Sequence, residues 1–184
     1  TAMASHLADL GHNVLMWTID EEQSNSINNC GKNTFCFQDT ILDKKIKCTL
    51  DIEEALLFSD RMIMAIPTQF VRDVCEKIKN SGHRSGHMLN LAKGIEITTG
   101  DLLHKIHEEL CPGYAYSALS GPSHAEEVLT GCPTAVAVAS EIKGEAEDWQ
   151  KLLTGNNFRV YTSDDVIGLE VGGATKNIYA VAAG

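Results

Sequence analysis

The sequence has no stretch in which lysine and arginine are concentrated. Its 184 residues carry 15 basic and 25 acidic side chains, which gives a formal net charge of −10 at pH 7. A surface that is acidic overall repels the phosphates of nucleic acids and the headgroups of anionic membranes. We therefore expect neither nucleic acid nor an anionic membrane surface among the partners of the protein.

Long apolar runs are also missing. No segment approaches the roughly 18–20 apolar residues that a membrane-spanning helix needs. The opening TAMASHLADLGH has neither a basic start nor a long apolar core, as a signal peptide would have. These absences predict no membrane span and no signal peptide, and we expect a cytoplasmic protein.

The six cysteines include no C-x-x-C pair, the spacing that metal sites and redox motifs use. We expect free thiols, buried or half-buried, of a cytosolic protein. His104 and His107 are spaced like two ligands on one helix face, but Lys105, Glu108 and Glu109 surround them. We interpret this segment as a solvated helix face and expect no metal site, with a metal-binding pair as the less favoured alternative.

Apolar residues make up 43% of the chain, enough to bury a substantial core. Short apolar segments alternate with segments of helical periodicity, which is typical of a parallel sheet covered by helices on both faces. Strands are expected at 13–17, 61–67, 87–93, 116–122, 133–140 and 158–163. Helices are expected at 1–12, from 51, and at 68–80, 100–111, 123–131, 145–153 and 164–184.

This alternation predicts an α/β fold with a doubly wound parallel sheet. The ligand site of such a sheet lies at the carboxyl ends of its strands, here after Trp17, Ile66, Leu91 and Ser120. A doubly wound domain normally starts with a strand and a glycine turn, whereas this chain begins on a helix and ends on small residues without a cap. We expect both ends to be cut from a longer chain.

Two of these strand ends carry candidate ligand-binding groups. Lys93 follows a strand and would point into the ligand crevice, although a lysine at the surface is the commoner case. The turn at 120–122 precedes Ser123, a candidate N-cap with Glu126 as its partner. The N–H groups of that helix start would favour an oxygen-rich ligand, and an ordinary capping box is the alternative.

The third candidate is Lys176, which stands alone among small and apolar residues in the last expected helix. Burial would lower the pKa of this lysine and make it a usable general base. The alternative is that its ammonium group snorkels to water. Asn177 beside it adds a neutral hydrogen-bonding group.

Together, the segments LAKGIE, LSGPSHAEEV and FRVYTSDDVIGLEVGGATKNIYAVAAG resemble the NAD(P)-dependent glycerol-3-phosphate dehydrogenases in order and spacing. AIPTQFVR and the opening helix with GHNVLMW extend the similarity over essentially the whole chain. The sequence departs from the family at Thr175 and Tyr179, where an aliphatic residue is usual. It also departs at 36–39, where CFQD replaces an aromatic-Leu-Pro-Gly sequence.

The resemblance implies an oxidoreductase that interconverts dihydroxyacetone phosphate and sn-glycerol 3-phosphate, with hydride passing to or from NAD or NADP. It implies a Rossmann-like domain at 1–163 that lacks its first strand and glycine loop, followed at 164–184 by the start of an all-helical substrate domain. It further implies a homodimer in the full-length enzyme and a role in phospholipid biosynthesis and carbohydrate metabolism. We expect the isolated chain to be inactive.

The resemblance also assigns roles to individual residues. Two lysines take part in catalysis: the acid/base is Lys176, and the second, a fixed charge near substrate and nicotinamide, is Lys93. Substrate contacts are implied for both lysines and for Gly121, Ser123 and Asn177. Cofactor contacts are implied for Ile19, Phe70, Lys93 and Ala125.

The segment WTIDEE bears on the choice between NAD and NADP. Ile19 is apolar where related bacterial enzymes often carry a basic or polar residue, and Asp20, Glu21 and Glu22 follow it. Carboxylates at the end of the second strand accept hydrogen bonds from the ribose of NAD and repel the 2′-phosphate of NADP. We expect NADH to be preferred; the alternative is that these acids only form the first turn of a helix capped by Asp20.

Two other functions remain open. A related two-domain hydroxy-acid dehydrogenase would carry a Ser-Gly-Gly turn and a lysine three or four residues before the asparagine, whereas here the turn is SGPS and Lys176 adjoins Asn177. A non-catalytic dinucleotide-binding module would tolerate the loss of Lys93 and Lys176, and both are present.

Overall fold

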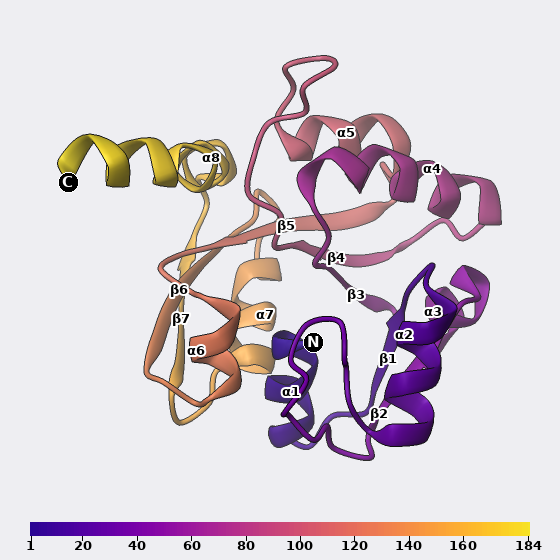
Figure 1. Ribbon diagram of the computed structural model, residues 1–184. Helices are drawn as coiled ribbons and strands as arrows, with labels where there is room; N and C mark the ends of the chain where they lie inside the picture. The colour runs from indigo at the N-terminus through magenta and orange to yellow at the C-terminus, as the bar shows by residue number, and fades with distance from the viewer.

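The computed structural model describes residues 1–184 and shows two β-sheets covered by helices (Figure 1). The larger sheet has the strand order β3-β4-β5-β6-β7. Its strands are β3 (Arg61–Met64), β4 (Gly86–Asn90), β5 (Tyr114–Ser120), β6 (Thr134–Ala139) and β7 (Phe158–Ser163). The smaller sheet pairs β1 (Val14–Trp17) with β2 (Ile46–Thr49) in parallel.

Helices separate most of the strands along the chain. They are α1 (Ala2–Asp9), α2 (Glu21–Asn25), α3 (Ile52–Phe58), α4 (Val71–Ser81), α5 (Leu103–Leu110), α6 (Ala125–Leu129), α7 (Glu145–Leu153) and α8 (Val166–Ala183). A π-helical turn at Ser26–Cys30 extends α2, and a 3₁₀ turn at Thr68–Phe70 leads into α4. None of the helices is long and apolar enough to cross a membrane.

The larger sheet is buried on both faces, as the predicted doubly wound fold requires. Neighbouring residues of a strand point to opposite faces. Met88 of β4 packs in the cluster with α4 and α5, while Leu89 packs in the cluster with Trp149 of α7. Both β4 side chains are at most 1% exposed, and burying a side chain of this kind stabilises the fold by about 1.5–3 kcal/mol.

The sheet is parallel except at one pair of strands. Strand β6 runs antiparallel to β5, with Ala118 opposite Ala139 and Ser120 opposite Ala137. The only helix between them, α6, has five residues and spans about 8 Å, whereas the seven residues of β5 span about 23 Å. A helix this short does not run back along the length of β5, and β6 returns in the opposite direction.

The two sheets are not joined. Strand β1 pairs with β2 alone and β3 pairs with β4 alone, so one edge of each strand faces a groove between the sheets. This groove has a volume of about 440 Å³ and a mostly apolar lining that includes Met16, Trp17 and Ile63. Two buried polar atoms without a hydrogen-bond partner, Nη1 of Arg61 and Nε1 of Trp149, belong to residues that line it.

Strand β2 is not among the strands expected from the sequence. Its pattern Ile-Lys-Cys-Thr buries Ile46 and Cys48 against Ala4 and Ala8 of α1 and Ile27. Four residues give too little periodicity to identify a strand, and the partners that fix it are distant in sequence. All six cysteines are free, three of them buried and three exposed.

The prediction of a solvated helix face around His104 and His107 is wrong. Both side chains are buried, at 7% and 5% exposure. Helix α5 turns them inward because His104 Nδ1 lies 2.7 Å from the Glu170 carboxylate of α8, and the ring of His107 stacks on that of Tyr116. The structure brings together no three His, Cys, Asp or Glu side chains that could hold a metal ion.

Candidate functional site

The carboxyl ends of β1, β3, β4 and β5 carry most of the residues singled out from the sequence. Ile19 follows β1, Phe70 lies in the 3₁₀ turn after β3, Lys93 follows β4, and Gly121 follows β5. The prediction that these residues lie at strand ends is confirmed by their positions. Which of them act on a ligand is a separate question, and the contacts below bear on it.

Lys93 is half-buried and directed towards the turn after β5. Its Nζ donates a hydrogen bond to the carbonyl oxygen of Gly121 at 3.0 Å. Burial, together with the positive charge of nearby Lys176, lowers the pKa of Lys93 below the usual value of a lysine. The two lysines that the sequence singled out therefore come within electrostatic reach of each other.

Helix α8 crosses close to this turn because of a glycine. A Cβ atom on Gly173 would lie 2.8 Å from Oγ of Ser120 and 3.5 Å from Cγ of Lys93. The missing side chain lets the helix backbone approach both β4 and β5. Asp165 caps the helix by accepting a hydrogen bond from the N–H of Gly168 at 2.7 Å.

A cavity of about 500 Å³ opens between α8 and the carboxyl end of β5. Its lining includes Ser120 and Gly121 of the turn, Gly172 and Gly173 of the helix, and Lys176. Lys176 is half-buried, which lies between the two alternatives of a buried lysine and one that reaches water. The arrangement places one ammonium group in a small cavity and a second beside it.

The other two predicted substrate residues, Ser123 and Asn177, do not line the cavity. The N–H of Ser123 donates to the carbonyl oxygen of Gly121 at 2.9 Å, so the backbone of Ser123 shares an acceptor with Lys93. Asn177 is exposed on α8 and does not line the cavity.

The predicted capping box at Ser123 and Glu126 is wrong. Helix α6 begins at Ala125, its N-cap is His124, and no side chain caps it. The turn around Pro122 leaves the chain extended for one residue more than the sequence pattern indicated. The hydrogen bond of the Ser123 N–H to Gly121 closes that turn instead of opening a helix.

Three apolar side chains at the site are exposed. Ile19 and Phe70 are 82% and 57% exposed, and Ala125 at the start of α6 is exposed as well. Exposed apolar side chains at strand ends offer packing surfaces to flat rings, and Lys93 supplies a positive charge beside them. Together these residues form an exposed apolar surface with one positive charge along the carboxyl ends of β1, β3 and β4.

The acidic segment after β1 is partly used within the fold. Asp20 caps α2, as the alternative interpretation expected, because its Oδ1 accepts from the N–H of Gln23 at 2.9 Å. Glu21 and Glu22 form the exposed first turn of α2. Two of the three carboxylates therefore stand free in solvent beside Ile19.

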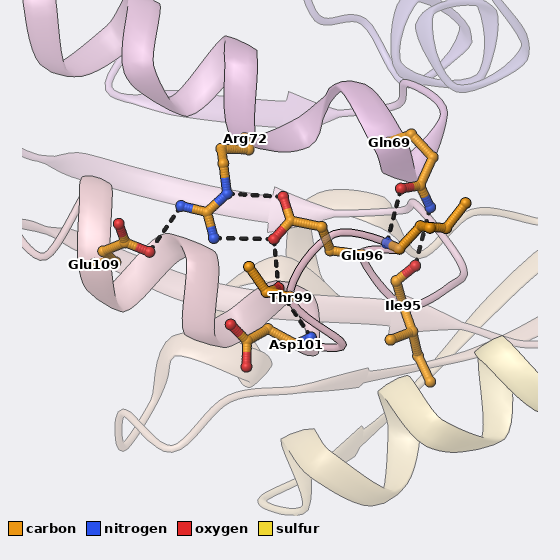
Figure 2. A network of polar contacts seen from close by, with 8 residues as sticks. Gln69, Arg72, Ile95, Glu96, Thr99, Asp101 and Glu109 are labelled. Carbon is orange, nitrogen blue, oxygen red and sulfur yellow. Dashed lines mark hydrogen bonds and ion pairs between the residues drawn. The ribbon is translucent and has the colours of Figure 1, made fainter.

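Sequence reasoning missed the side chains that hold the Lys93 loop. Arg72 of α4 binds Glu96, and Gln69 of the preceding 3₁₀ turn binds the backbone around Ile95 (Figure 2). The segment AIPTQFVR contains both, and their spacing of three residues puts them on one helix face. Their partners lie more than twenty residues away, so the local pattern gave no sign of the contact.

Comparison with known proteins gives a consistent result. A family profile described as the N-terminus of NAD-dependent glycerol-3-phosphate dehydrogenase matches residues 1–146. The glycerol-3-phosphate dehydrogenase (NAD(P)+) of Halothermothrix orenii is 44% identical over 184 residues, which are 100% of this chain and 54% of that protein. The protein of the same name from Clostridium acetobutylicum is 40% identical and matches over 55% of its length.

Solved structures agree with these matches. The crystal structure of glycerol-3-phosphate dehydrogenase from Coxiella burnetii superposes with a TM-score of 0.91 at 28% identity, over 98% of this chain and 55% of that one. A GDP-mannose dehydrogenase from Pseudomonas aeruginosa shares the fold, with a TM-score of 0.76 at 13% identity over 99% of this chain and 48% of that one. The chain spans about half the length of the curated relatives it matches.

Proposed function

The chain belongs to the family of NAD-dependent glycerol-3-phosphate dehydrogenases, and from this premise we propose that it is part of an oxidoreductase. The proposed enzyme interconverts dihydroxyacetone phosphate and sn-glycerol 3-phosphate. The observation that carries the proposal is the meeting of Lys93 and Lys176 at the turn after β5. Two cations at one strand end suit a phosphorylated, anionic substrate whose C2 oxygen gains negative charge during reduction.

We assign the acid/base role to Lys176, which lines the cavity. Reduction of the carbonyl requires a proton at the C2 oxygen, and oxidation requires its removal. A lysine can perform both transfers when its ammonium group lies within hydrogen-bond reach of that oxygen. Lys176 is half-buried and lines the cavity, so part of its side chain is available to a ligand bound there.

Lys93 then acts as a fixed positive charge. Its hydrogen bond to Gly121 orients the ammonium group towards the same turn that Lys176 faces. A preorganised charge stabilises a developing alkoxide without reorganising during the reaction. Gly121, Ser123 and Asn177 complete the proposed substrate contacts.

The proposed cofactor, NAD or NADP, supplies or accepts the hydride when bound. Ile19 would pack beside its adenosine ribose, and Phe70, Lys93 and Ala125 would hold it nearer the substrate. The exposure of Ile19 and Phe70 supports these assignments, because both offer uncovered apolar surface at strand ends.

The wider context is proposed on the same basis. Residues 1–163 would form the dinucleotide-binding domain and 164–184 the start of a helical substrate domain, in an enzyme that works as a homodimer. Its six free cysteines suit a reducing compartment, which supports a cytoplasmic location. The product, sn-glycerol 3-phosphate, connects carbohydrate metabolism with phospholipid biosynthesis.

Replacement of Lys176 tests the proposal in the complete protein that the gene encodes. Removing a positioned acid/base costs about 10²–10⁴ in rate, so Lys176→Met should lower kcat for dihydroxyacetone phosphate by that factor and leave the Kd for NADH nearly unchanged. Lys151→Met is the control, since Lys151 is a 75% exposed side chain on α7, bonded only to Asp148. A wild-type protein without this activity would contradict the function, and near wild-type kcat in Lys176→Met would contradict the role.

A further inference from the structure

The loop that carries Lys93 has little backbone support of its own. Residues 91–102 join β4 to α5 without forming a helix or a strand. The N–H groups of Lys93, Gly94 and Ile95 make no backbone–backbone hydrogen bond. Side chains hold the backbone on both sides of Lys93. Before it, the amide of Asn90 donates to the carbonyl oxygen of Ala92 and accepts from its N–H, both at 3.2 Å.

After Lys93 the restraint is an ion pair between the half-buried Arg72 and the buried Glu96. Nε and Nη2 of Arg72 donate to the two carboxylate oxygens of Glu96, at 2.7 and 3.0 Å (Figure 2). Thr99 donates from its hydroxyl to the same carboxylate, and Glu96 is only 5% exposed. A two-point contact between guanidinium and carboxylate fixes both distance and orientation, so it anchors the loop three residues after Lys93.

A second side chain, that of Gln69, binds the backbone of the two residues that flank Glu96. The amide of Gln69 donates to the carbonyl oxygen of Ile95 at 2.9 Å and accepts from the N–H of Ile97 at 3.0 Å. Gln69 and Arg72 thus hold the backbone on either side of Glu96 and the carboxylate itself (Figure 2). We call Gln69, Arg72 and Glu96 the loop clamp.

The loop clamp works against a repulsion. Lys93 is half-buried near the positive charge of Lys176, and both effects disfavour its ammonium form at that place. A loop free to move would relieve this by letting the ammonium group swing into water. The hydrogen bond from Nζ to Gly121 shows that it stays at the turn instead.

We propose that Arg72 and Glu96 are positioning residues, which hold the Lys93 ammonium at the Gly121 turn without touching the substrate themselves. The inference rests on the proposed function for its effect on catalysis, whereas the effect on Lys93 itself does not depend on any reaction. Gln69 assists by fixing the neighbouring backbone. The position of Lys93 relative to Lys176 is then determined from α4, on the far side of the loop.

The effect on Lys93 is measured by competitive acylation of the amines of the complete protein over a pH series, with mass spectrometry of the peptide that contains Lys93. Glu96→Gln keeps the shape of the side chain but removes its charge, and Arg72→Lys keeps the charge but loses the two-point contact. In both variants the labelling midpoint of Lys93 should rise towards that of an ordinary lysine, because the ammonium group gains access to water. Either variant alone suffices if the other fails to fold.

Glu109→Gln is the matched control. Glu109 binds Nη1 of the same Arg72 at 2.7 Å, but its side chain is 59% exposed on α5 and does not touch the loop. Its loss should leave the Lys93 midpoint unchanged. A midpoint that stays unchanged in Glu96→Gln and Arg72→Lys, or that rises equally in Glu109→Gln, would overturn the proposal.

Kinetics test the consequence for the reaction. A misplacement of about 1 Å can cost about 100-fold in rate, so kcat for dihydroxyacetone phosphate should fall about 10- to 100-fold in Glu96→Gln, with the Kd for NADH unchanged. A shifted Lys93 midpoint with unchanged kcat would overturn the positioning role. If the wild-type protein does not reduce dihydroxyacetone phosphate, the proposed function fails, while the labelling result still decides whether the clamp holds Lys93.

Discussion

At the scale of single residues, the site holds an unfavourable pair of charges. Burial and the neighbouring Lys176 both disfavour protonated Lys93 in the folded protein, whereas in the unfolded chain the same ammonium group is fully hydrated. The folded state therefore binds this proton more weakly than the unfolded state does. By linkage, stability must rise with pH between the lowered pKa of the folded state and the ordinary pKa of lysine.

Replacing Lys93 should consequently stabilise the protein while damaging its activity. Lys93→Met removes the buried charge, and the carbonyl of Gly121 keeps a donor in the N–H of Ser123. We expect a higher Tm than wild type at neutral pH, with the difference shrinking as the pH approaches the ordinary pKa of lysine. For dihydroxyacetone phosphate, kcat should fall and KM should rise, because a charge contact serves both binding and the transition state.

Calorimetry at several pH values, combined with steady-state kinetics, checks both halves of this expectation. Lys151→Met again serves as the control, because its ammonium group is exposed and should change neither Tm nor kcat appreciably. A Tm for Lys93→Met that is lower than wild type at neutral pH would show that the hydrogen bond to Gly121 outweighs the burial of the charge.

At the scale of elements, α8 is fixed to the sheet by one carboxylate. Glu170 is 7% exposed and accepts hydrogen bonds from the N–H of His104 at 3.1 Å and from His104 Nδ1 at 2.7 Å. The hydroxyl of Tyr116 donates to Oε1 of the same carboxylate. Burial and the Glu170 carboxylate raise the pKa of Tyr116 far above its usual value, so this hydroxyl remains a donor.

Loss of Glu170 should therefore loosen the helix that carries Lys176. Glu170→Ala leaves buried donors on His104 and Tyr116 without an acceptor, at a cost of about 1–3 kcal/mol in the free energy of unfolding. We expect a lower Tm and faster amide hydrogen exchange in α8. Glu108→Ala is the control: it removes only an exposed pair with Lys105 on the same α5, and should change little. Equal effects of the two substitutions would rule out the anchoring role.

The same elements show what local sequence patterns can and cannot reveal. The sequence alone predicted β3, β4 and α4. Burial makes the two strands continuous apolar segments and gives the helix an apolar residue at every third or fourth position. The inward turn of His104 did not, since its partner Glu170 is 66 residues away. The pairing of Arg72 with Glu96 escaped for the same reason.

At the scale of the molecule, the order of elements determined more than any motif. Alternating strands and helices predicted a site at the carboxyl strand ends, and Lys93 and Gly121 meet there. The reversal of β6 could not be read from the alternation. The direction of a strand depends on which strand edge it finds as a partner, and this is a property of the assembled chain.

The molecule as a whole also bears on cofactor choice. The net charge is −10, and at the end of β1 the exposed Ile19 is followed by Asp20, which caps α2, and by the free carboxylates of Glu21 and Glu22. A 2′-phosphate carries about two negative charges. At the end of β1 it would lie near these carboxylates, and the segment after β1 offers it no basic side chain. We therefore expect a higher kcat/KM with NADH than with NADPH, measured with dihydroxyacetone phosphate at matched ionic strength in the complete protein.

A charge introduced at the same place should reverse the preference. A hydrogen bond to a charged group contributes about 1.5–3 kcal/mol, so Ile19→Arg should raise the NADPH-to-NADH ratio of kcat/KM about 10- to 100-fold. Leu57→Arg is the matched control, because the Leu57 side chain is 80% exposed. Leu57 lies near the end of α3, next to the amino end of β3, whereas Ile19 lies at the carboxyl end of β1. It adds the same charge to the molecule and should leave the ratio nearly unchanged. A wild-type preference for NADPH would contradict the repulsion argument, and an equal shift in both variants would show that net charge, not the position at the end of β1, sets the choice.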